Sequence, residues 1–247
     1  MGPMFVNDDS VFGLVIRKLN RLAPLERADI DAIRSLPFKV GAVGANRHIV
    51  REGDVVSECC VLLSGYACRH KTTSNGGRQI VSFHLPGDIL DLQHLLFSRA
   101  DHNLQTITAA TIARVPVAEL SRIVQERPAL NNALWRDTLI DASIFREWVL
   151  NVGRRDGKTR IAHMLCEFAS RRAAAGLGSP QAFEMPMTQE QIGDATGLTA
   201  VHVNRVLQEL GRDGVIARDK RKVQIADWQR MCRVGDFDPT YLHAAAA

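Results

Sequence analysis

The sequence contains no apolar run near the roughly 18 residues that a membrane-spanning helix needs. Its first twelve residues include Asp8 and Asp9 and lack the basic-then-apolar order of a secretory signal. The five cysteines form no CxxC pair, a pattern that fits neither a disulfide framework nor a zinc site and favours a reducing compartment. We therefore expect a cytoplasmic protein without a membrane partner.

Composition is that of an ordinary globular chain of one or two domains, with 247 residues, 46% of them apolar and 23% charged. The formal net charge is +4, and its distribution is uneven. Residues 157–235 alone carry a net +4, whereas the twice longer stretch 1–156 carries only +2. The late part of the chain is where a polyanion would dock.

Between about residues 40 and 117, short apolar runs alternate with turns that contain glycine. The runs are His48–Arg51, Cys60–Ser64, Tyr66–His70, Gln79–Leu85, Ile89–Leu92, Leu104–Thr108 and Ile112–Val117. Their spacing of about 11 residues is typical of an all-β sandwich or barrel. Helical periodicity over Phe12–Leu22 and Leu25–Leu36 predicts two helices before it.

A short helix is expected over Glu119–Glu126 and a long one from Leu130 to about Val152. Apolar residues lie on more than one face of the long helix, whereas a globular helix normally has one apolar stripe. We favour dimerisation through the second face, and a central helix of a larger core is the alternative. Residues 153–157 (GRRDG) predict a hinge.

The stretch Met187–Gly211 reads MTQEQIGDATGLTAVHVNRVLQELG. Thr188 is a good N-cap with Gln191 as its capping-box partner, Gly197 suits a left-handed turn, and Thr199 caps a second helix that ends at Gly211. Two short helices joined by a glycine turn predict a helix-turn-helix, whose second helix enters the major groove of DNA. A helical hairpin with a solvated basic turn is the alternative.

The outward side of the second helix has the chemistry of base readout. Arg205 could bind guanine O6 and N7, Asn204 could bracket adenine N6 and N7, and Val201 could meet a thymine methyl group. After Gly211, a basic hairpin predicts a wing over the phosphate backbone. The candidate DNA-binding residues are Thr188, Gln189, Thr199, Ala200, Val201, His202, Asn204, Arg205, Gln208, Lys220, Arg221 and Lys222.

In this order, a β-rich domain, a long helix, a short hinge and a winged helix-turn-helix resemble the Crp/Fnr family of bacterial transcription regulators. The best anchors are Pro86-Gly87-Asp88, Arg160-Ile161-Ala162 and Met187–Leu207. The resemblance implies an α+β fold in four parts: a double-stranded β-helix (β-roll, cyclic-nucleotide-binding-like) sensor domain with N-terminal helices, a dimerisation helix with hinge, a winged helix-turn-helix domain and a tail. Their expected ranges are 1–128, 129–156, 157–235 and 236–247.

The effector signatures of the family are not matched. Cyclic-nucleotide binders carry Gly-Glu and then Arg-Ser or Arg-Thr, which fall here near Asp91-Leu92 and near residues 100–103 (ADHN), so cyclic AMP is not expected. Many members read a C·G pair with a glutamate that falls at Val201, so the half-site is expected to differ from the standard one. No cysteine precedes Cys59, which argues against the N-terminal iron–sulfur cluster of the oxygen-sensing branch.

Cys68 and His70 share one face of a strand, but we favour an incidental pair over haem ligation, so haem is also not expected. The candidate effector pocket contains acidic, polar and aromatic residues: Asp91, Leu92, Gln93, Arg99, Asp101, His102 and Phe145. It could take a cationic or polar effector or sense protons. The simpler interpretation, which we favour, is a solvated loop with turn caps.

The sequence thus predicts a homodimeric transcription regulator that is not an enzyme. Its expected partners are a palindromic site on double-stranded DNA and RNA polymerase; its effector is unknown, and neither a cofactor nor a metal is predicted. A cupin-like metal enzyme is the main alternative, but the five histidines of the β segment lack HxH or HxxxxE spacing. A protein–protein module built on the long helix is the third hypothesis. Adjacent Cys59 and Cys60 could sense redox state, although buried strand cysteines are commoner.

Overall fold

The protein is described by a computed structural model over residues 10–243. The chain forms two compact units. Within the described residues, the first unit contains residues 10–70 and 84–142, and the second contains residues 71–83 and 143–243. Among these residues, no helix is both long and apolar enough to cross a bilayer.

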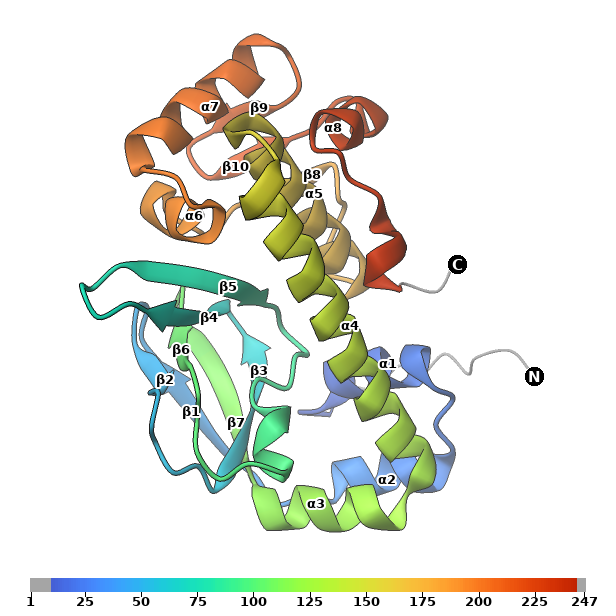
Figure 1. The fold of residues 1–247 in the computed structure, drawn as a ribbon. Coiled ribbons are helices and arrows are strands. Elements are labelled where there is room, and N and C mark those ends of the chain that lie inside the picture. Colours follow the sequence, from blue (N-terminus) through green and yellow to red (C-terminus); the bar gives the residue numbers. More distant parts are fainter. Residues whose placement is uncertain (1–9, 244–247) are drawn as a thin grey trace. The chain divides into compact units, whose positions relative to one another are not determined.

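The β-rich part of the chain consists of β1 (Lys39–Val43), β2 (His48–Val50), β3 (Glu58–Ser64), β4 (Ala67–Thr72), β5 (Arg78–His84), β6 (Asn103–Thr106) and β7 (Ala110–Pro116). One sheet has the strand order β1-β7-β3 and the other the order β2-β6-β4-β5 (Figure 1). Cys59 and Val61 of β3 lie opposite Val115 and Ala113 of β7, and all four are buried in one core. The predicted β-roll is confirmed.

The helices of the first unit are α1 (Gly13–Leu22), α2 (Arg27–Arg34), α3 (Val117–Glu126) and the first half of α4 (Pro128–Arg154). Each of them turns an apolar stripe toward the β1-β7-β3 sheet. Ile16 and Leu19 of α1, Ile123 of α3 and Leu130 of α4 are almost fully buried there. The helices predicted before and after the β segment are therefore present and form the core with it.

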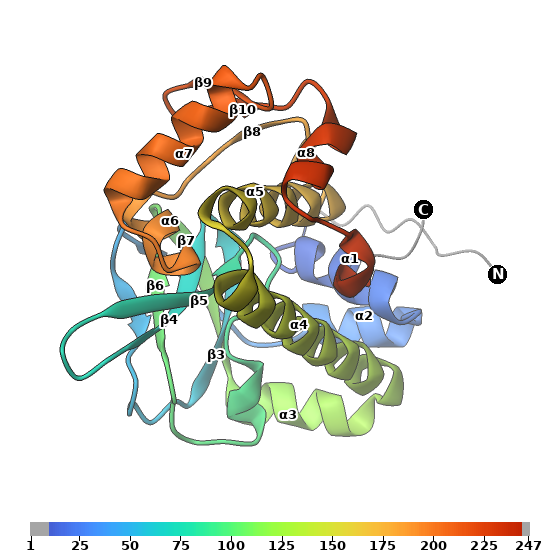
Figure 2. The same cartoon turned by 45° about the horizontal axis from the view of Figure 1, so that its top comes forward.

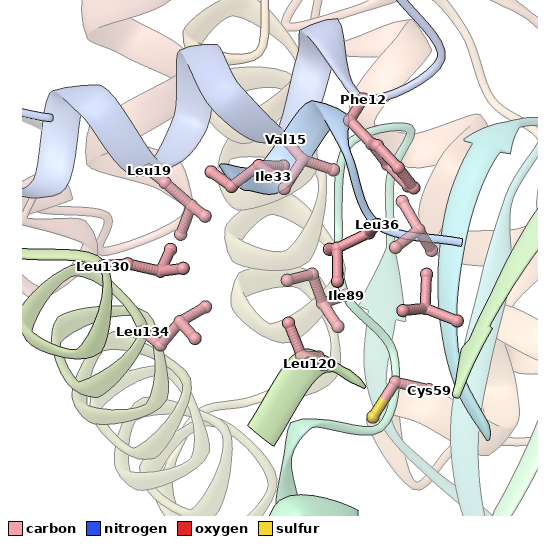
Figure 3. A pocket seen from close by; sticks show the side chains of 12 residues that line it. Phe12, Val15, Leu19, Ile33, Leu36, Cys59, Ile89, Leu120, Leu130 and Leu134 are labelled. Carbon is pink, nitrogen blue, oxygen red and sulfur yellow. The ribbon is translucent and has the colours of Figure 1, made fainter. Parts of the chain in front are cut away.

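A small cavity lies in this core, lined by the side chains in Figure 3. Its volume is about 20 Å³. Phe12 and Leu19 of α1, Leu134 of α4 and Cys59 of β3 are among the apolar side chains around it. A space of this size holds at most one water molecule, and no polar side chain lines it to hold that water. The cavity is a packing gap and not a ligand site.

Three charged side chains join α1, α4 and the loop after β5 within the first unit. Lys18 Nζ lies 2.8 Å from Asp88 Oδ1 and 2.8 Å from Asp137 Oδ1. Burial works to lower the pKa of Lys18, but the two carboxylates outweigh it and raise that pKa above its ordinary value. Burial also raises the pKa of Asp137 against the opposing charge of Lys18, so this carboxylate depends on the lysine for its ionisation.

Two elements of the first unit differ from the prediction. The apolar run Ile89–Leu92 is not a strand: Ile89 makes a single bridge to Val61, and residues 92–95 form a 3₁₀ helix. A short apolar run is compatible with a buried loop as well as with a strand, because it is too short to show a periodicity that distinguishes them. Strand β1 was missed because four of its five residues are exposed and Gly41 interrupts any apolar pattern.

The second unit contains α5 (Gly157–Ala174), α6 (Gln189–Thr196), α7 (Ala200–Arg212) and α8 (Trp228–Val234). Its small sheet has the order β8-β10-β9, from β8 (Ala182–Glu184), β9 (Ala217–Asp219) and β10 (Lys222–Gln224). Figure 2 shows α7 and α8 on either side of this sheet. The predicted hinge is shorter than expected, because Gly153 lies inside α4 and only Arg155 and Asp156 separate α4 from α5.

Residues 236–243 of the predicted tail are packed against the rest of the second unit. Phe237 and Leu242 are buried, and Tyr241 donates a hydrogen bond from its hydroxyl to Glu167 Oε2 over 2.8 Å. The indole Nε1 of Trp148 donates to the same oxygen over 3.0 Å. These bonds tie α4, α5 and the C-terminal segment together, while residues 244–247 of the predicted tail lie outside the described residues.

The ion cluster of Lys18 yields a stability prediction. Lys18→Met should lower the free energy of unfolding by about 3 kcal/mol, because two largely buried carboxylates lose their counter-charge. Chemical denaturation at pH 7 measures it. The matched control is Arg27→Met, whose ion pair with Asp31 is exposed and which should cost less than about 1 kcal/mol. Equal effects of the two variants would contradict the assigned role of the cluster.

Candidate nucleic-acid interface and sensor interior

Helix α6 begins as its sequence predicts. The hydroxyl of Thr188 accepts from Gln191 N over 3.2 Å, and Gln191 Oε1 accepts from Thr188 N over 2.9 Å. This reciprocal pair satisfies two backbone donors that a helix N-terminus leaves without partners. The predicted capping box at Thr188 is confirmed.

The turn after α6 depends on two glycines. Gly197 has φ +68°, a left-handed conformation that residues with a Cβ rarely adopt. Gly193 is fixed by space instead, because a Cβ there would lie 2.4 Å from Leu198 O. The Leu198 amide donates to Gly193 O over 3.0 Å, so the turn lies directly against the helix backbone. The glycine turn of the helix-turn-helix is confirmed.

Helix α7 is the predicted recognition helix. Its N-cap Thr199 accepts from His202 N over 3.2 Å. Its inner side is buried through Val203, Val206, Leu207 and Leu210. The predicted end at Gly211 is wrong by one residue, since α7 continues to Arg212 with Asp213 as its C-cap. A glycine costs a helix about 1 kcal/mol relative to alanine, which does not by itself end the helix.

The structure exposes most of the predicted DNA-contacting side chains. Val201 is 81% exposed. Five other predicted residues are exposed on α7 or at the caps of α6 and α7, namely Thr188, Thr199, Ala200, Arg205 and Gln208, and three are exposed in the wing, namely Lys220, Arg221 and Lys222. Gln189, His202 and Asn204 are half-buried.

Two hydrogen bonds order the outward side of the helix-turn-helix. Gln189 Nε2 donates to Asn204 Oδ1 over 3.1 Å, which connects α6 to α7. Arg205 Nη2 donates to His202 Nε2 over 3.2 Å, since a guanidinium has only donors. His202 also lies against the start of α5, where a Cβ on Gly157 would be 2.9 Å from its Nε2.

The wing is formed by β9 and β10, paired antiparallel with Ala217 opposite Gln224. Lys220 has φ +52° in the turn between them, and the carbonyl of Lys220 accepts from Arg218 Nη2 over 3.3 Å. The basic side chains of the hairpin are exposed, as the sequence predicts. The third strand β8, which pairs with β10, was not predicted because it is only three residues long.

The sequence did not reveal the role of one positioning residue. Arg160 of α5 donates from Nη1 to Thr196 O over 3.1 Å and from Nε to Arg155 O over 2.8 Å. It therefore holds the C-terminal end of α6, where carbonyl groups lack helical partners. The sequence predicts that a cation is favourable at that end, but it does not show which of the distant cations reaches it.

In the first unit, four of the predicted effector residues come together. His102 lies with Nδ1 2.7 Å from Asp101 Oδ1 and with Nε2 3.3 Å from Gln93 Nε2 and 3.9 Å from Asp91 Oδ1. Since Gln93 Nε2 can only donate, His102 Nε2 accepts and Nδ1 carries the proton. Asp101 is largely exposed and Asp91 is completely buried.

The other three predicted pocket residues lie elsewhere. Arg99 is exposed and donates from Nη1 to Gly53 O over 3.1 Å, so it does not turn toward Asp91. Leu92 packs against the apolar core of the first unit. Phe145 is half-buried on α4 and belongs to the second unit.

Asp91 is an unusual buried group. Neither of its carboxylate oxygens accepts a hydrogen bond from any residue within 10–243. Burial raises its pKa to about 6, against the opposing charges of His94, Arg69 and Arg114. The neighbouring thiols follow the same physics, since burial and the charge of Asp91 raise the pKa of Cys59 and Cys60 to about 12.

Comparison with protein families finds two matches in this chain. A model of the cyclic nucleotide-binding domain matches residues 42–127. A model of the Crp-like helix-turn-helix domain matches residues 159–234. The two matches coincide with the β-roll and with the helix-turn-helix and wing described above.

The curated relatives that match this chain are transcription regulators, and the match covers most of their length. The transcriptional activator protein FnrL of Cereibacter sphaeroides is 31% identical over 192 residues, which is 76% of each chain. The nitrogen fixation regulation protein FixK of Bradyrhizobium diazoefficiens is 30% identical over 193 residues, 78% of this chain and 80% of the relative.

Solved structures show the same fold. FixK2 from Bradyrhizobium japonicum aligns with a TM-score of 0.74 at 24% identity, over 86% of this chain and 100% of that one. A mutant of CooA from Carboxydothermus hydrogenoformans aligns with a TM-score of 0.64 at 16% identity, over 80% of this chain and 88% of that one.

The buried carboxylate of Asp91 gives a prediction about pH. The folded protein binds a proton at Asp91 more readily than the unfolded chain does, so stability is lost as pH rises from about 4 through about 6. Asp91→Asn removes the charge. It should raise the free energy of unfolding at pH 7.5 by about 2–3 kcal/mol and change it little at pH 4.

Chemical denaturation of both proteins at the two pH values measures this effect. Asp31→Asn, at a half-exposed carboxylate on α2, serves as the control and should change stability by less than about 0.5 kcal/mol at either pH. A destabilised Asp91→Asn at pH 7.5 would show that the ionised carboxylate is stabilising, contrary to this prediction.

Proposed function

We propose that two copies of this chain bind one two-fold-symmetric site on double-stranded DNA. The premise is that the chain belongs to the Crp/Fnr family of transcription regulators. The chain is a regulator with a helix-turn-helix DNA-binding domain and, like its relatives, not an enzyme. The observation that carries the proposal is the outward side of α7, which keeps Val201 and Arg205 exposed on a helix capped at its entry.

The DNA would be contacted in two ways. The N-terminal half of α7 would enter the major groove and meet base edges through Val201, Asn204 and Arg205. The caps of α6 and α7 and the basic wing would bind phosphates, which fix the register of the protein on the duplex. Because these contacts displace counterions, the logarithm of the affinity should fall linearly with the logarithm of the salt concentration.

The second copy would pair along α4. Four large apolar side chains are exposed on this helix, namely Trp135 at 56%, Leu139 at 57%, Val149 at 70% and Leu150 at 44%. Residues 135, 139 and 142 follow the alternating four- and three-residue spacing of a coiled-coil seam, and residue 149 lies one heptad after 142, with Arg146 at the seam position between them. Paired helices of this kind would place two recognition helices on half-sites about one helical turn apart, roughly 34–36 Å.

The β-roll would receive the regulatory signal, and its residues do not fit a cyclic nucleotide. The cyclic phosphate requires a cation with donors to spare. Arg69 is held by Asp141 at Nη1 and by Leu90 O at Nη2, and only its Nε is buried without a partner. Arg99 points to Gly53 O, and Asp91 adds a buried carboxylate that would repel the phosphate. We propose a signal of different chemistry.

We also propose that Cys59 and Cys60 do not hold an iron–sulfur cluster. The high pKa of the buried Cys59 and Cys60 thiols opposes the thiolate form that an iron–sulfur cluster requires. For the output, RNA polymerase is the partner we propose, because FnrL, one of the relatives, is named a transcriptional activator.

The recognition helix can be tested with one substitution. Purified protein is first used to select fragments from genomic DNA, which should recover a palindromic motif. Arg205→Ala should then bind that motif about 10- to 100-fold more weakly, because a bidentate contact to guanine contributes about 1–3 kcal/mol of discrimination. Fluorescence anisotropy on the selected duplex and on a scrambled duplex measures both affinities.

Arg122→Ala removes the same charge from α3, where Arg122 pairs with Glu119 and Glu126 of its own helix, and should leave binding unchanged. Binding that ignores sequence in the unsubstituted protein would sink the proposed function. Binding by Arg205→Ala as tight as that of the unsubstituted protein would remove Arg205 from the contact set.

The dimer interface can be tested on α4. Leu139→Glu places a charge on the exposed apolar face and should convert the dimer into a monomer, with a loss of at least about tenfold in affinity for the full palindrome. Sedimentation velocity gives the mass. Leu96→Glu, at a leucine that is 80% exposed outside α4, is the control and should stay dimeric. A dimeric Leu139→Glu would rule out this face of α4.

A further inference from the structure

The amide of Asn204 has a fixed partner before any DNA arrives. Gln189, the first residue of α6, donates from Nε2 to Asn204 Oδ1 over 3.1 Å. Both side chains are half-buried, so water competes for this hydrogen bond less than it would on an open surface. The bond spans the two helices of the helix-turn-helix, and it decides which end of the Asn204 amide is turned toward α6.

The two ends of an asparagine amide have opposite chemistry. Its oxygen only accepts hydrogen bonds and its NH₂ group only donates them. In the structure the oxygen is turned to Gln189, and the NH₂ group therefore lies on the other side of the amide. The exocyclic groups of the bases divide along the same line in the major groove, because guanine O6 and thymine O4 are acceptors, whereas adenine N6 and cytosine N4 are donors; the N7 acceptor is common to both purines.

We infer that Gln189 is a specificity-determining residue, which orients Asn204 so that its NH₂ group meets a keto base, guanine or thymine, at one position of each half-site. The inference rests on the proposed function, since it names the base class that the recognition helix selects. It differs from the adenine-bracketing contact expected from the sequence. That contact needs the amide oxygen and nitrogen side by side on the base edge, and the oxygen is held by Gln189.

Its neighbours reinforce this selection. Arg205 presents only donors, and its contact with His202 occupies Nη2 while its remaining N–H groups are left for DNA. Val201 presents only methyl groups. Positions 201, 204 and 205 in the N-terminal half of α7 thus offer two sets of donors and an apolar patch, which fit acceptor-rich base edges and a thymine methyl group.

The orientation of Gln189 itself is compatible with bound DNA. Its Nε2 carries two hydrogens, of which one is used on Asn204. The capped N-terminus of α6, where Gln189 lies, is the type of helix end that binds phosphates, and a phosphate accepts hydrogen bonds only. A phosphate there would favour the same NH₂-inward arrangement and would couple the position of the backbone to the reading of the base.

A single isosteric substitution at Gln189 should reverse the orientation of the Asn204 amide. In Gln189→Glu the side chain keeps its shape but can only accept, so Asn204 should turn its amide over, donate from Nδ2 to the new carboxylate and present Oδ1 to the DNA. The base it meets should then be an amino base, adenine or cytosine. The full-length unsubstituted protein and the variant are each used to select duplexes from a randomised pool, and the bound DNA is sequenced.

The position read by Asn204 is identified with Asn204→Ala, which should lose base preference there and keep the rest of the motif. At that position the unsubstituted protein should favour keto over amino bases by a ratio of about ten, and Gln189→Glu should invert the ratio, as one hydrogen bond with a polar base edge contributes about 1–1.5 kcal/mol. A ratio at one position is insensitive to the uniform loss of affinity that an added negative charge causes.

Gln189→Ala covers the case in which Gln189→Glu binds no DNA. Without a partner on α6 the amide can turn either way, and the keto-to-amino ratio should fall toward one. Thermal melting confirms that each variant is folded, and Gln125→Glu on α3 controls for the added charge.

The outcomes separate the two proposals. Selection of no motif by the unsubstituted protein overturns the proposed function together with this inference. A palindromic motif with adenine or cytosine at the Asn204 position, or an unchanged ratio in both Gln189 variants, overturns this inference alone and leaves the proposed function standing.

Discussion

The close approach of Gly193 to the turn after its helix is the constraint on which the DNA-binding unit depends. There is no room for a Cβ between the backbone of α6 and the carbonyl of Leu198. That contact sets the separation and the angle of α6 and α7. It therefore brings Gln189 within hydrogen-bond distance of Asn204, which lies 15 positions further along the chain. A backbone contact far from the groove thus determines the chemistry that the groove would meet.

Local signals in the sequence were sufficient for much of this unit. The caps at Thr188 and Thr199 and the left-handed turn at Gly197 each depend on residues within four positions of one another, and all three are present. The buried stripe of α7 follows from helical periodicity alone. The end of α7 was wrong by one residue because a glycine near a helix end is compatible with either side of the boundary.

Signals that depend on distant partners could not be read in this way. Asn204 gives no sign in the sequence of which end of its amide points outward, because the answer lies with Gln189 on another helix. The same holds for Arg99, which turns to the carbonyl of Gly53, and for Ile89–Leu92, where an apolar run became a buried loop. Asp91 was predicted as a residue of the effector pocket, but its complete burial could be seen only in the folded structure.

The three tryptophans of the chain occupy different surroundings. Trp148 is buried with its indole on Glu167, Trp228 is half-buried, and Trp135 is more than half exposed on α4. Indole emission shifts to shorter wavelengths when water is removed from around the ring. If a second copy covers α4, the emission of Trp135 should shift when the dimer forms. Intrinsic fluorescence would then follow dimerisation without an attached dye.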